Sequence, residues 1–180
     1  VPSTAGECKG LLKTAIRDND PVMFFEHKML YTTKFNDVPE VEEDVCIPFG
    51  RARIVAEGAD ITVVTNSMMT IKAEKAVRQL QKEGISAELI DLRTIVPLDT
   101  ETIIRSVKKT GKLLIVDEGH LSFGITGEIA SRIMPDVFYD LDAPIQRMGT
   151  ADVPLPFSPA LEFPLIPDEK KIAAKIREMV

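Results

Sequence analysis

The sequence has few of the residues that build disulfide frameworks or metal centres. Its 180 residues include only two cysteines, Cys8 and Cys46. Neither lies in a spacing typical of metal ligands, and two cysteines make a disulfide framework a poor expectation. We expect Cys8 to lie on a helix, Cys46 to lie in a connection, and the protein to work in a reducing compartment.

Several signatures of independent enzymes are also absent. There is no GxGxxG after an expected strand, no GxxxxGK[ST] and no HExxH. No serine lies in a G-x-S-x-G context. The only two histidines, His27 and His120, are far apart in the sequence. A stand-alone hydrolase, kinase or dehydrogenase is therefore poorly supported.

A basic excess and a long apolar run are missing as well. The formal net charge is −6, whereas nucleic acids and anionic membranes bind basic surfaces. No apolar run approaches the roughly 20 residues that span a bilayer. We therefore expect neither nucleic acid nor membrane as a partner. The negative charge fits a basic protein partner, and it fits a role in solubility equally well.

What the sequence does contain is the pattern of an α/β domain. Hydrophobic residues make up 44% and charged residues 28% of the chain, enough to bury a core. After Gly50, apolar strands alternate with helical periods, which predicts a three-layer α/β/α sandwich with a largely parallel sheet. The expected strands are 51–55, 61–65, 87–92, 113–117 and 145–148. The expected helices begin at 66 or 67, 97, 125 and 168, and a loop is expected at 119–124.

The first residues predict one β-α-β step. Thr4 and Glu7 form a T-x-x-E capping box, which starts a helix that ends before Asp18-Asn19-Asp20-Pro21. The apolar residues 22–26 predict a short buried strand. Val1-Pro2-Ser3 is typical of a strand that runs into a helix cap, so we expect the chain to begin in mid-fold. It is then the C-terminal piece of a longer subunit.

Residues 27–50 show no sustained period. They contain Pro39, Pro48 and Gly50, together with an acid run at residues 40–44. Prolines and glycine without a hydrophobic period predict a linker between two domains. The acid run is most often part of such a solvated connection.

Two loops could carry chemistry because they follow expected strands. Glu118 and His120 lie just beyond residues 113–117, and His27 ends the expected strand 22–26. Ligands of open α/β sheets bind at the carboxyl ends of strands, and a carboxylate beside an imidazole can do acid–base work. Structural pairing or lining of an active site is the alternative for all three residues.

A third candidate is a cation site at the end of the first helix. The carbonyls of Ala15 and Ile16 have no partner within the helix, and Asp18 and Asp20 add carboxylates beside them. Carbonyl and carboxylate oxygens suit a hard cation. The alternative is an ordinary helix stop before proline.

Taken in order, these segments resemble one family across essentially the whole chain. The chain is similar to the beta subunit of the thiamine-diphosphate-dependent, decarboxylating component of 2-oxoacid dehydrogenase complexes, a relative of the transketolase C-terminal half. The motifs that carry the resemblance are Lys9-Gly10-Leu11-Leu12, Ala15-Ile16-Arg17-Asp18, Pro21-Val22, Glu26-His27-Lys28-Met29-Leu30-Tyr31, Ile47-Pro48-Phe49-Gly50, Glu88-Leu89-Ile90-Asp91-Leu92-Arg93-Thr94, Pro97-Leu98-Asp99, Leu141-Asp142-Ala143-Pro144, Ala151-Asp152-Val153-Pro154 and Pro156-Phe157.

The resemblance implies a division of the chain at about residue 45. Residues 1–45 look like the end of the pyrimidine-binding domain with its linker, and residues 46–180 like a transketolase-type C-terminal domain. The family's sheet is mixed, with an antiparallel first strand. Its catalytic glutamate and histidine lie upstream of Val1, so no catalytic or cofactor-binding residue is expected here. Thiamine diphosphate and magnesium would be held by that missing half and by the alpha subunit.

Two further sites follow from the resemblance. Some members bind a structural potassium ion at the step that matches Ala15, Ile16, Asp18 and position 20, where Asp20 replaces the usual asparagine. The family also docks the subunit-binding domain of the acyltransferase through an acid that matches Asp142 and through the chain end, here Val180. The expected partners are therefore an alpha subunit, a second beta subunit (α2β2) and that acyltransferase domain.

One position departs from the family. Where the family has tryptophan this chain has His120, as transketolases often have in that loop. The activity implied is decarboxylation of a 2-oxoacid and acylation of a lipoyl group by the whole heterotetramer, in a bacterial cytoplasm or a mitochondrial matrix. An acetoin-cleaving or transketolase-like enzyme and a stand-alone assembly module remain as alternatives.

Overall fold

A five-stranded sheet forms the centre of the structure, a computed structural model that describes residues 1–32 and 45–180. The strand order is β1-β3-β2-β4-β5. β1 runs antiparallel to β3, and the other neighbouring pairs are parallel, which confirms the expected mixed sheet. The strands are β1 (Arg53–Ala56), β2 (Ile61–Thr65), β3 (Ala87–Asp91), β4 (Leu113–His120) and β5 (Gln146–Thr150).

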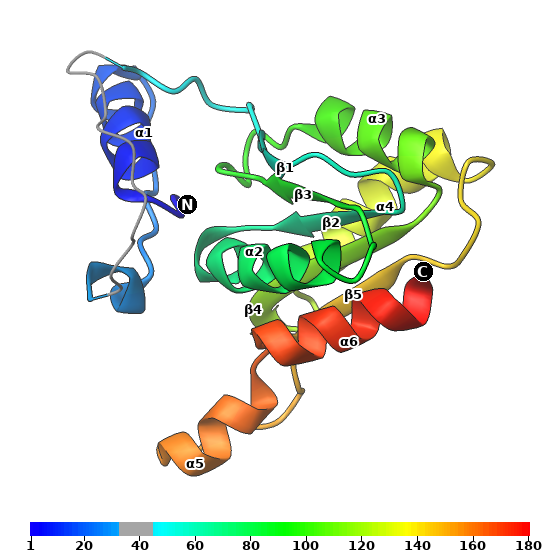
Figure 1. The fold of residues 1–180 in the computed structure, drawn as a ribbon. Coiled ribbons are helices and arrows are strands. Elements are labelled where there is room, and N and C mark those ends of the chain that lie inside the picture. The colour runs from blue at the N-terminus through cyan, green and yellow to red at the C-terminus, as the bar shows by residue number, and fades with distance from the viewer. Residues whose placement is uncertain (33–44) are drawn as a thin grey trace.

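Two helical layers cover the sheet (Figure 1). α2 (Ser67–Gln81) and α6 (Glu169–Met179) pack on one face, and α3 (Thr100–Thr110) and α4 (Ile125–Val137) pack on the other. The three-layer α/β/α sandwich expected from the alternation of strands and helices is therefore confirmed.

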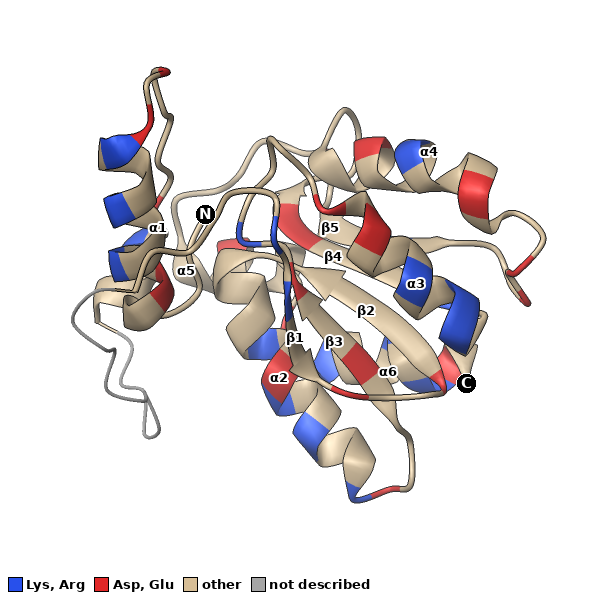
Figure 2. Cartoon of the chain, turned by 90° about the horizontal axis from the view of Figure 1, so that it is seen from above, with Lys and Arg blue, Asp and Glu red and all other residues tan. Residues whose placement is uncertain are grey.

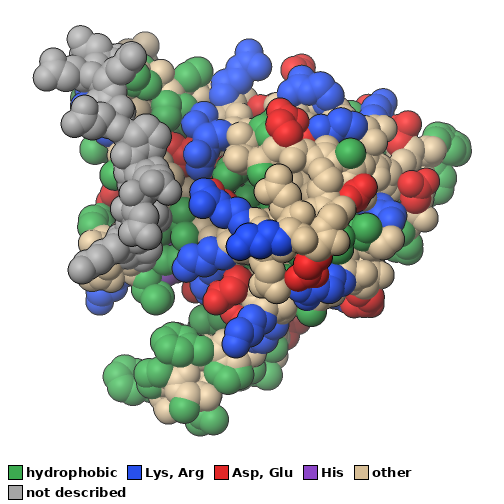
Figure 3. All heavy atoms as spheres, viewed as in Figure 1, with side chains coloured by type: hydrophobic (Ala, Val, Ile, Leu, Met, Phe, Trp, Pro, Cys, Tyr) green, Lys and Arg blue, Asp and Glu red, His purple; other side chains and the backbone are tan. Residues whose placement is uncertain are grey.

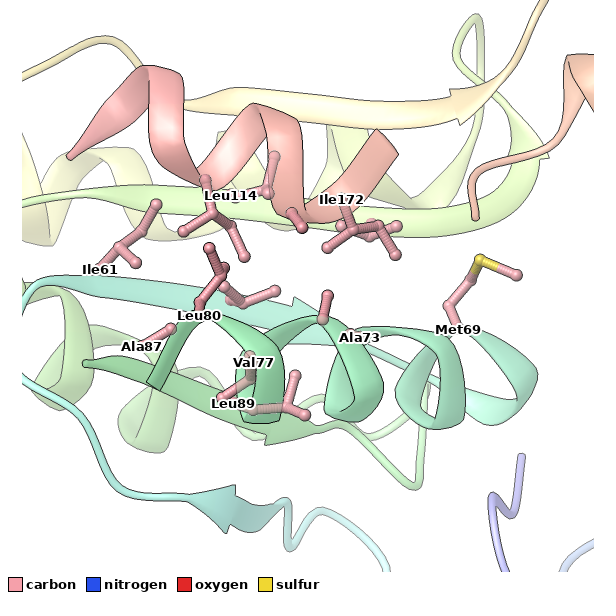
Figure 4. Packing of buried hydrophobic residues seen from close by; sticks show 14 of the residues in the cluster. Ile61, Met69, Ala73, Val77, Leu80, Ala87, Leu89, Leu114 and Ile172 are labelled. Carbon is pink, nitrogen blue, oxygen red and sulfur yellow. The ribbon is translucent and has the colours of Figure 1, made fainter. Parts of the chain in front are cut away.

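The core is split between the two faces because successive side chains of a strand point to opposite sides. Val63, Leu89 and Leu114 contact the α2 and α6 side, whereas their neighbours in the chain contact the α3 and α4 side. Figure 4 shows Val77 of α2 beside Leu89 of β3, and Leu80 and Ala73 of α2 pointing toward α6, which carries Ile172. Strands that are buried on both faces read as continuous apolar runs, which is why their positions could be predicted.

Several element boundaries differ from the predicted ones. β4 continues to His120, where the sequence predicted a loop from residue 119, because His120 still pairs with Thr150 of β5. α4 continues past Met134 to Val137 with Pro135 inside it. Gly84 and Gly111 end helices with φ of 89° and 69°, a conformation that glycine adopts without strain.

The N-terminal segment is a helix followed by an extended chain. α1 (Ala5–Arg17) begins at Thr4, whose Oγ1 accepts the N–H of Glu7 at 3.2 Å, while the N–H of Ser3 donates to Glu7 Oε2 at 3.1 Å. The capping box therefore forms, although the reciprocal bond involves Ser3 rather than Thr4. A 3₁₀ turn, Lys28–Tyr31, follows the extended stretch.

The predicted buried strand at residues 22–26 is wrong for the described structure. These residues form no ladder with any described strand, and Met23 is 80% and Phe25 59% exposed. An extended segment becomes a strand only where a neighbouring strand takes up its N–H and C=O groups. Within the described residues no such neighbour lies beside 22–26.

Short elements connect β5 to the last helix. α5 (Pro159–Glu162) and a 3₁₀ turn, Phe163–Leu165, interrupt the proline-rich stretch and project from the sandwich. Figure 3 shows hydrophobic side chains gathered on this projection. The exposed apolar residues there, which we call the α5 lobe, are Leu155, Phe157, Leu161 and Phe163.

Charged residues are interspersed over the helices. Along α4, acidic and basic positions alternate (Figure 2), and Arg132 Nε contacts Glu128 Oε1 at 2.6 Å. The acid run at residues 40–44, which was expected to be a solvated connection, lies outside the described residues. In the part of the chain that the structure describes, no helix is long and apolar enough to cross a membrane.

Candidate functional site

A crevice opens at the carboxyl ends of β2 and β4. After β2 the chain adds β3 on one side of β2 and then crosses to the other side to form β4. The connections therefore leave these two neighbouring strands in opposite directions. In open α/β sheets such a switch point separates the loops and is where ligands bind. Any ligand site in this sandwich is expected there first.

A cavity of about 160 Å³ occupies the crevice. Four parts of the chain meet around it: Val1, the extended stretch before the 3₁₀ turn, the start of α2 and the end of β4. It is small beside the roughly 300–1,000 Å³ of pockets that hold drug-sized ligands. Its lining residues are Val1, Phe25, Glu26, His27, Asn66, Ser67, Met68, Met69 and Glu118.

His27 and Glu118, which the sequence singled out separately, meet in this crevice. His27 Nε2 lies 2.6 Å from Glu118 Oε2, and the N–H of Met29 donates to His27 Nδ1 at 3.2 Å. Since Nδ1 accepts a hydrogen bond, the proton of the neutral ring belongs on Nε2, where it donates to Glu118. Both ring nitrogens are thus engaged. The pair joins the N-terminal segment to β4 rather than presenting a free base.

Asn66 and Ser67 at the start of α2 are functional candidates that sequence reasoning treated only as caps. Asn66 occupies the cap position, but its Nδ2 donates to Asp117 Oδ1 at 2.8 Å instead of capping the helix. Ser67 has a φ of 47°, which is uncommon for a residue other than glycine. An asparagine directly after a buried strand was the one available signal. Its partner Asp117 could not be foreseen.

His120 is placed apart from the other candidates. Its Nδ1 lies 2.9 Å from the carbonyl oxygen of Ala151, and it does not line the crevice cavity. Asp152 nearby accepts both the hydroxyl and the N–H of Ser122, which hold the pKa of its carboxyl below the usual value. The structure therefore brings two of the three predicted lining residues together and leaves His120 on the surface.

A buried charge cluster joins α1 to the sheet. Glu7 of α1 is 4% exposed, and its Oε1 accepts a hydrogen bond from Arg93 Nε at 2.8 Å. Arg53 Nε of β1 approaches the same oxygen at 2.7 Å, an ionic contact without hydrogen-bond alignment. Arg53 Nη2 also lies 3.5 Å from Asp91 Oδ2 at the end of β3. We call Glu7, Arg53, Asp91 and Arg93 the α1 cluster.

Burial acts differently on the two carboxyls of the α1 cluster. For Glu7, burial raises the pKa, but Arg53 and Arg93 outweigh burial, and the pKa lies below its usual value. For Asp91, which is fully buried, burial and then the charge of Glu7 raise the pKa to about 7. Two carboxylates that compete for nearby cations separate in pKa in this way.

A second hollow, of about 610 Å³, lies between α1 and residues 26–31. On its wall Glu26 accepts hydrogen bonds from Cys8 Sγ at 3.0 Å and from the Tyr31 hydroxyl at 2.7 Å. Burial, and then the hydrogen bond to Glu26, raise the pKa of the Cys8 thiol to about 11. Cys8 is therefore an unreactive thiol, and the cysteines are unpaired as expected.

The predicted cation residues lie together at the end of α1. The N–H of Asp18 donates to the carbonyl of Ala15 at 3.3 Å, and the N–H of Asp20 donates to Asp18 Oδ1 at 2.9 Å. Ile16 beside them is 76% exposed. Among the described residues, no group of three or more His, Cys, Asp or Glu side chains is arranged to hold a metal ion. The cation site, which would rest mainly on carbonyls, stays a prediction.

The two predicted docking residues reach the same turn, between α3 and β4. The N–H of Asp142 donates to the carbonyl of Gly111 at 2.8 Å, and Lys112 Nζ donates to a carboxyl-terminal oxygen of Val180 at 3.5 Å. Both residues are exposed. This corner lies at the amino end of β4, at the opposite end of the sheet from the crevice. The chain thus carries two separate candidate surfaces.

Comparison with known proteins shows which protein family the chain resembles. A family model for the transketolase C-terminal domain matches residues 50–172. A solved structure, described as a split-gene transketolase in an inactive beta4 tetramer, is similar with a TM-score of 0.74 and 25% identity. The match covers 99% of this chain and 55% of the transketolase chain.

Curated relatives are similar along the whole chain. The pyruvate dehydrogenase E1 component subunit beta of Rickettsia felis is 47% identical over 179 residues, 99% of this chain. The 2-oxoisovalerate dehydrogenase subunit beta of Bacillus subtilis is 43% identical over 180 residues. The acetoin:2,6-dichlorophenolindophenol oxidoreductase subunit beta of Cupriavidus necator is 45% identical over 177. The chain spans 54%, 54% and 52% of their respective lengths.

Proposed function

The chain belongs to the transketolase C-terminal domain family, and we propose that it is the C-terminal part of the beta subunit of a thiamine-diphosphate-dependent 2-oxoacid dehydrogenase. The observation that carries the proposal is the extent of the likeness to E1 beta subunits. The alignment with one such subunit is 47% identical over 179 residues. It therefore includes residues before 50, which the family model leaves unmatched. The full enzyme would decarboxylate a 2-oxoacid and pass the acyl group to a lipoyl group.

The described residues do not fit a complete thiamine diphosphate site. The crevice cavity of about 160 Å³ is too small for such a cofactor. We therefore place the cofactor with the rest of the subunit and the alpha subunit, and we derive no catalytic step from this chain. Its own contribution would be assembly.

Assembly would use surfaces that the chain leaves apolar. On the N-terminal segment Ile16, Met23 and Tyr31 are 76%, 80% and 71% exposed. The α5 lobe adds Phe157 at 101%. Apolar side chains that gather on one surface, as those of the α5 lobe do (Figure 3), mark an interaction site. The proposed occupants are the remainder of the beta subunit, the alpha subunit and a second beta subunit.

Docking to the acyltransferase core is assigned to the Asp142 corner. Asp142 and the Val180 carboxylate place two negative groups near one turn. Beside Asp142, a hollow of about 640 Å³ is lined by α4, Phe138, residues 141–145 and, at one side, the cation Arg147. A basic domain with an apolar anchor would fit both features, and charge pairs at its rim would steer encounter and fix register.

The test of docking is titration of the chain with an acyltransferase subunit-binding domain by calorimetry. Asp142→Ala is expected to weaken binding roughly 5- to 30-fold, as loss of an ionic hydrogen bond worth about 1–2 kcal/mol does. Asp136→Asn, on the exposed side of α4, is the matched control and should bind as wild type. Unchanged affinity in the Asp142 variant would remove this residue from the docking site.

The test of the enzyme proposal needs the full-length subunit with its alpha partner. Activity against pyruvate, branched 2-oxoacids, acetoin and sugar phosphates separates the dehydrogenase from the acetoin-cleaving and transketolase-like alternatives. Residues 1–180 alone should show no thiamine-dependent decarboxylation. Turnover by the chain alone would contradict the assignment of chemistry to other parts, and inactivity of the full complex on every substrate would favour an assembly module. The cation at Asp18 and the compartment stay predictions.

A further inference from the structure

Glu7 is the main buried link between α1 and the sheet. Of the 13 residues of α1, only Glu7, Gly10 and Leu11 are buried. Glu7 therefore enters the interface where an apolar residue would ordinarily be expected. A buried carboxylate is costly unless it is paired and hydrogen-bonded. The docked position of α1 consequently depends on the charge balance of the α1 cluster.

Asp91 is the member of the α1 cluster whose charge is least compensated. The N–H of Arg93 donates to its Oδ1 at 3.2 Å, whereas Oδ2 accepts no hydrogen bond from the described residues. The groups facing it are Glu7 from α1, Arg53 from β1, Arg93 after β3, and the Ser3 hydroxyl and Val1 amino group from the N-terminal residues. Two acids compete here for the guanidinium group of Arg53, while that of Arg93 contacts Glu7.

We propose that the α1 cluster is a proton-operated latch, in which a proton on Asp91 strengthens the docking of residues 1–17 on the sheet. With Asp91 neutral, Arg53 and Arg93 are free to neutralise Glu7. With Asp91 ionised, two buried carboxylates repel each other across the interface and share the cation of Arg53. Lifting α1 away would expose Asp91 to water and relieve this repulsion.

The direction of the pH dependence follows from proton binding. In the docked state the pKa of Asp91 is raised to about 7 from the ordinary value of 3.8. The docked state therefore holds the extra proton. This contribution to docking is fully present below pH 3.8, declines as pH rises, and is lost as pH passes through about 7. The lowered pKa of Glu7 acts in the opposite sense, because docking is lost as pH falls below its usual 4.5. The latch should hold best between pH 3.8 and 4.5, where the two opposing dependences meet.

Native-state hydrogen exchange of the α1 backbone amides measures docking. A detached helix of this length is marginal in water, so undocking exposes its amides. After correction for intrinsic exchange, protection of α1 should fall by up to roughly twentyfold from pH 5.5 to pH 7.5, as linkage to a pKa near 7 requires. Amides of α2 serve as the internal reference and should change much less.

Asp91→Asn is the decisive variant because it keeps the shape of the neutral acid and removes its titration. Protection of α1 should become nearly independent of pH over that range, while the control Asp136→Asn keeps the wild-type slope. A flat wild-type profile, or a full slope in the Asp91 variant, would overturn the proposal. If that variant fails to fold, carbon-13 NMR of the wild-type chain decides: a carboxyl midpoint for Asp91 below pH 5 refutes the latch.

Discussion

The sandwich domain and the N-terminal segment are stabilised by different interactions. Residues 50–180 bury apolar side chains on both faces of a sheet, where Leu80, Leu89 and Ile133 are fully enclosed. Residues 1–32 bury only Leu11 among their large apolar side chains and attach through Glu7 and His27. The first region is stabilised by area removed from water, and the second by a few polar contacts.

This difference predicts two levels of stability in one molecule. Regions with few buried apolar contacts open at a free energy well below that of global unfolding. The N-terminal segment is therefore expected to detach while the sandwich stays folded. In the proposed full-length subunit, the rest of the protein would cover its exposed residues and remove the difference.

The largest expected effect is on the sandwich core. Leu80→Ala removes a side chain that is 0% exposed between α2, α6 and the sheet. We expect a loss of about 2–5 kcal/mol in the free energy of unfolding, the usual cost of a cavity in a packed core. Denaturant unfolding followed by circular dichroism measures it. Leu12→Ala on exposed α1 is the control, and an equal loss there would erase the contrast between the regions.

A smaller and more local effect is expected at Glu7. Glu7→Gln keeps the shape but removes the charge that Arg53 and Arg93 neutralise. Docking of α1 should weaken by about 1–3 kcal/mol, the cost of a lost charged hydrogen bond at a buried site. Limited proteolysis within residues 1–32 should speed up while the unfolding of the sandwich stays within error. A matching loss in the sandwich would mean that both regions unfold as one unit.

The smallest effect is expected at the crevice pair. His27→Gln breaks a hydrogen bond between side chains that are about a fifth and a third exposed. We expect no more than about 1 kcal/mol, seen as faster exchange of the amides near Met29. Glu118→Gln should give a similar value, and the double variant should add little. Fully additive effects would show that the two side chains do not act as a pair.

The predictable part of the fold is the part whose pattern is local. Largely apolar runs predict strands at residues 61–65 and 113–117, and Gly84 and Gly111 predict helix ends. Residues 22–26 carry the same apolar pattern, yet they form no strand in the described structure. An apolar run indicates only that a segment favours burial, whereas a β-strand also needs a neighbouring strand to hydrogen-bond with. The antiparallel direction of β1 came only from the family resemblance.

The candidate sites depended on contacts between distant residues. Glu118 and His27 were each proposed from their position after an expected strand, but their pairing across 91 residues was not foreseeable. The α1 cluster was missed altogether, because Glu7 was interpreted as part of a capping box and sequence reasoning assigned Arg53, Asp91 and Arg93 no role of their own. They come together because β1 lies beside β3 in the sheet. That Asp142 and Val180 contact the same turn could likewise be known only from the folded structure.

The measurement that tests the central claim most directly is hydrogen exchange of the whole chain at increasing denaturant, at pH 7.5. We expect α1 amides to exchange through a low-energy opening that denaturant barely affects. Amides of β2 and β4, at the centre of the sheet, should exchange only through global unfolding. If α1 and the central strands merge onto one opening energy at all denaturant concentrations, the chain is a single cooperative unit. The division into an attached segment and a self-sufficient domain would then be contradicted.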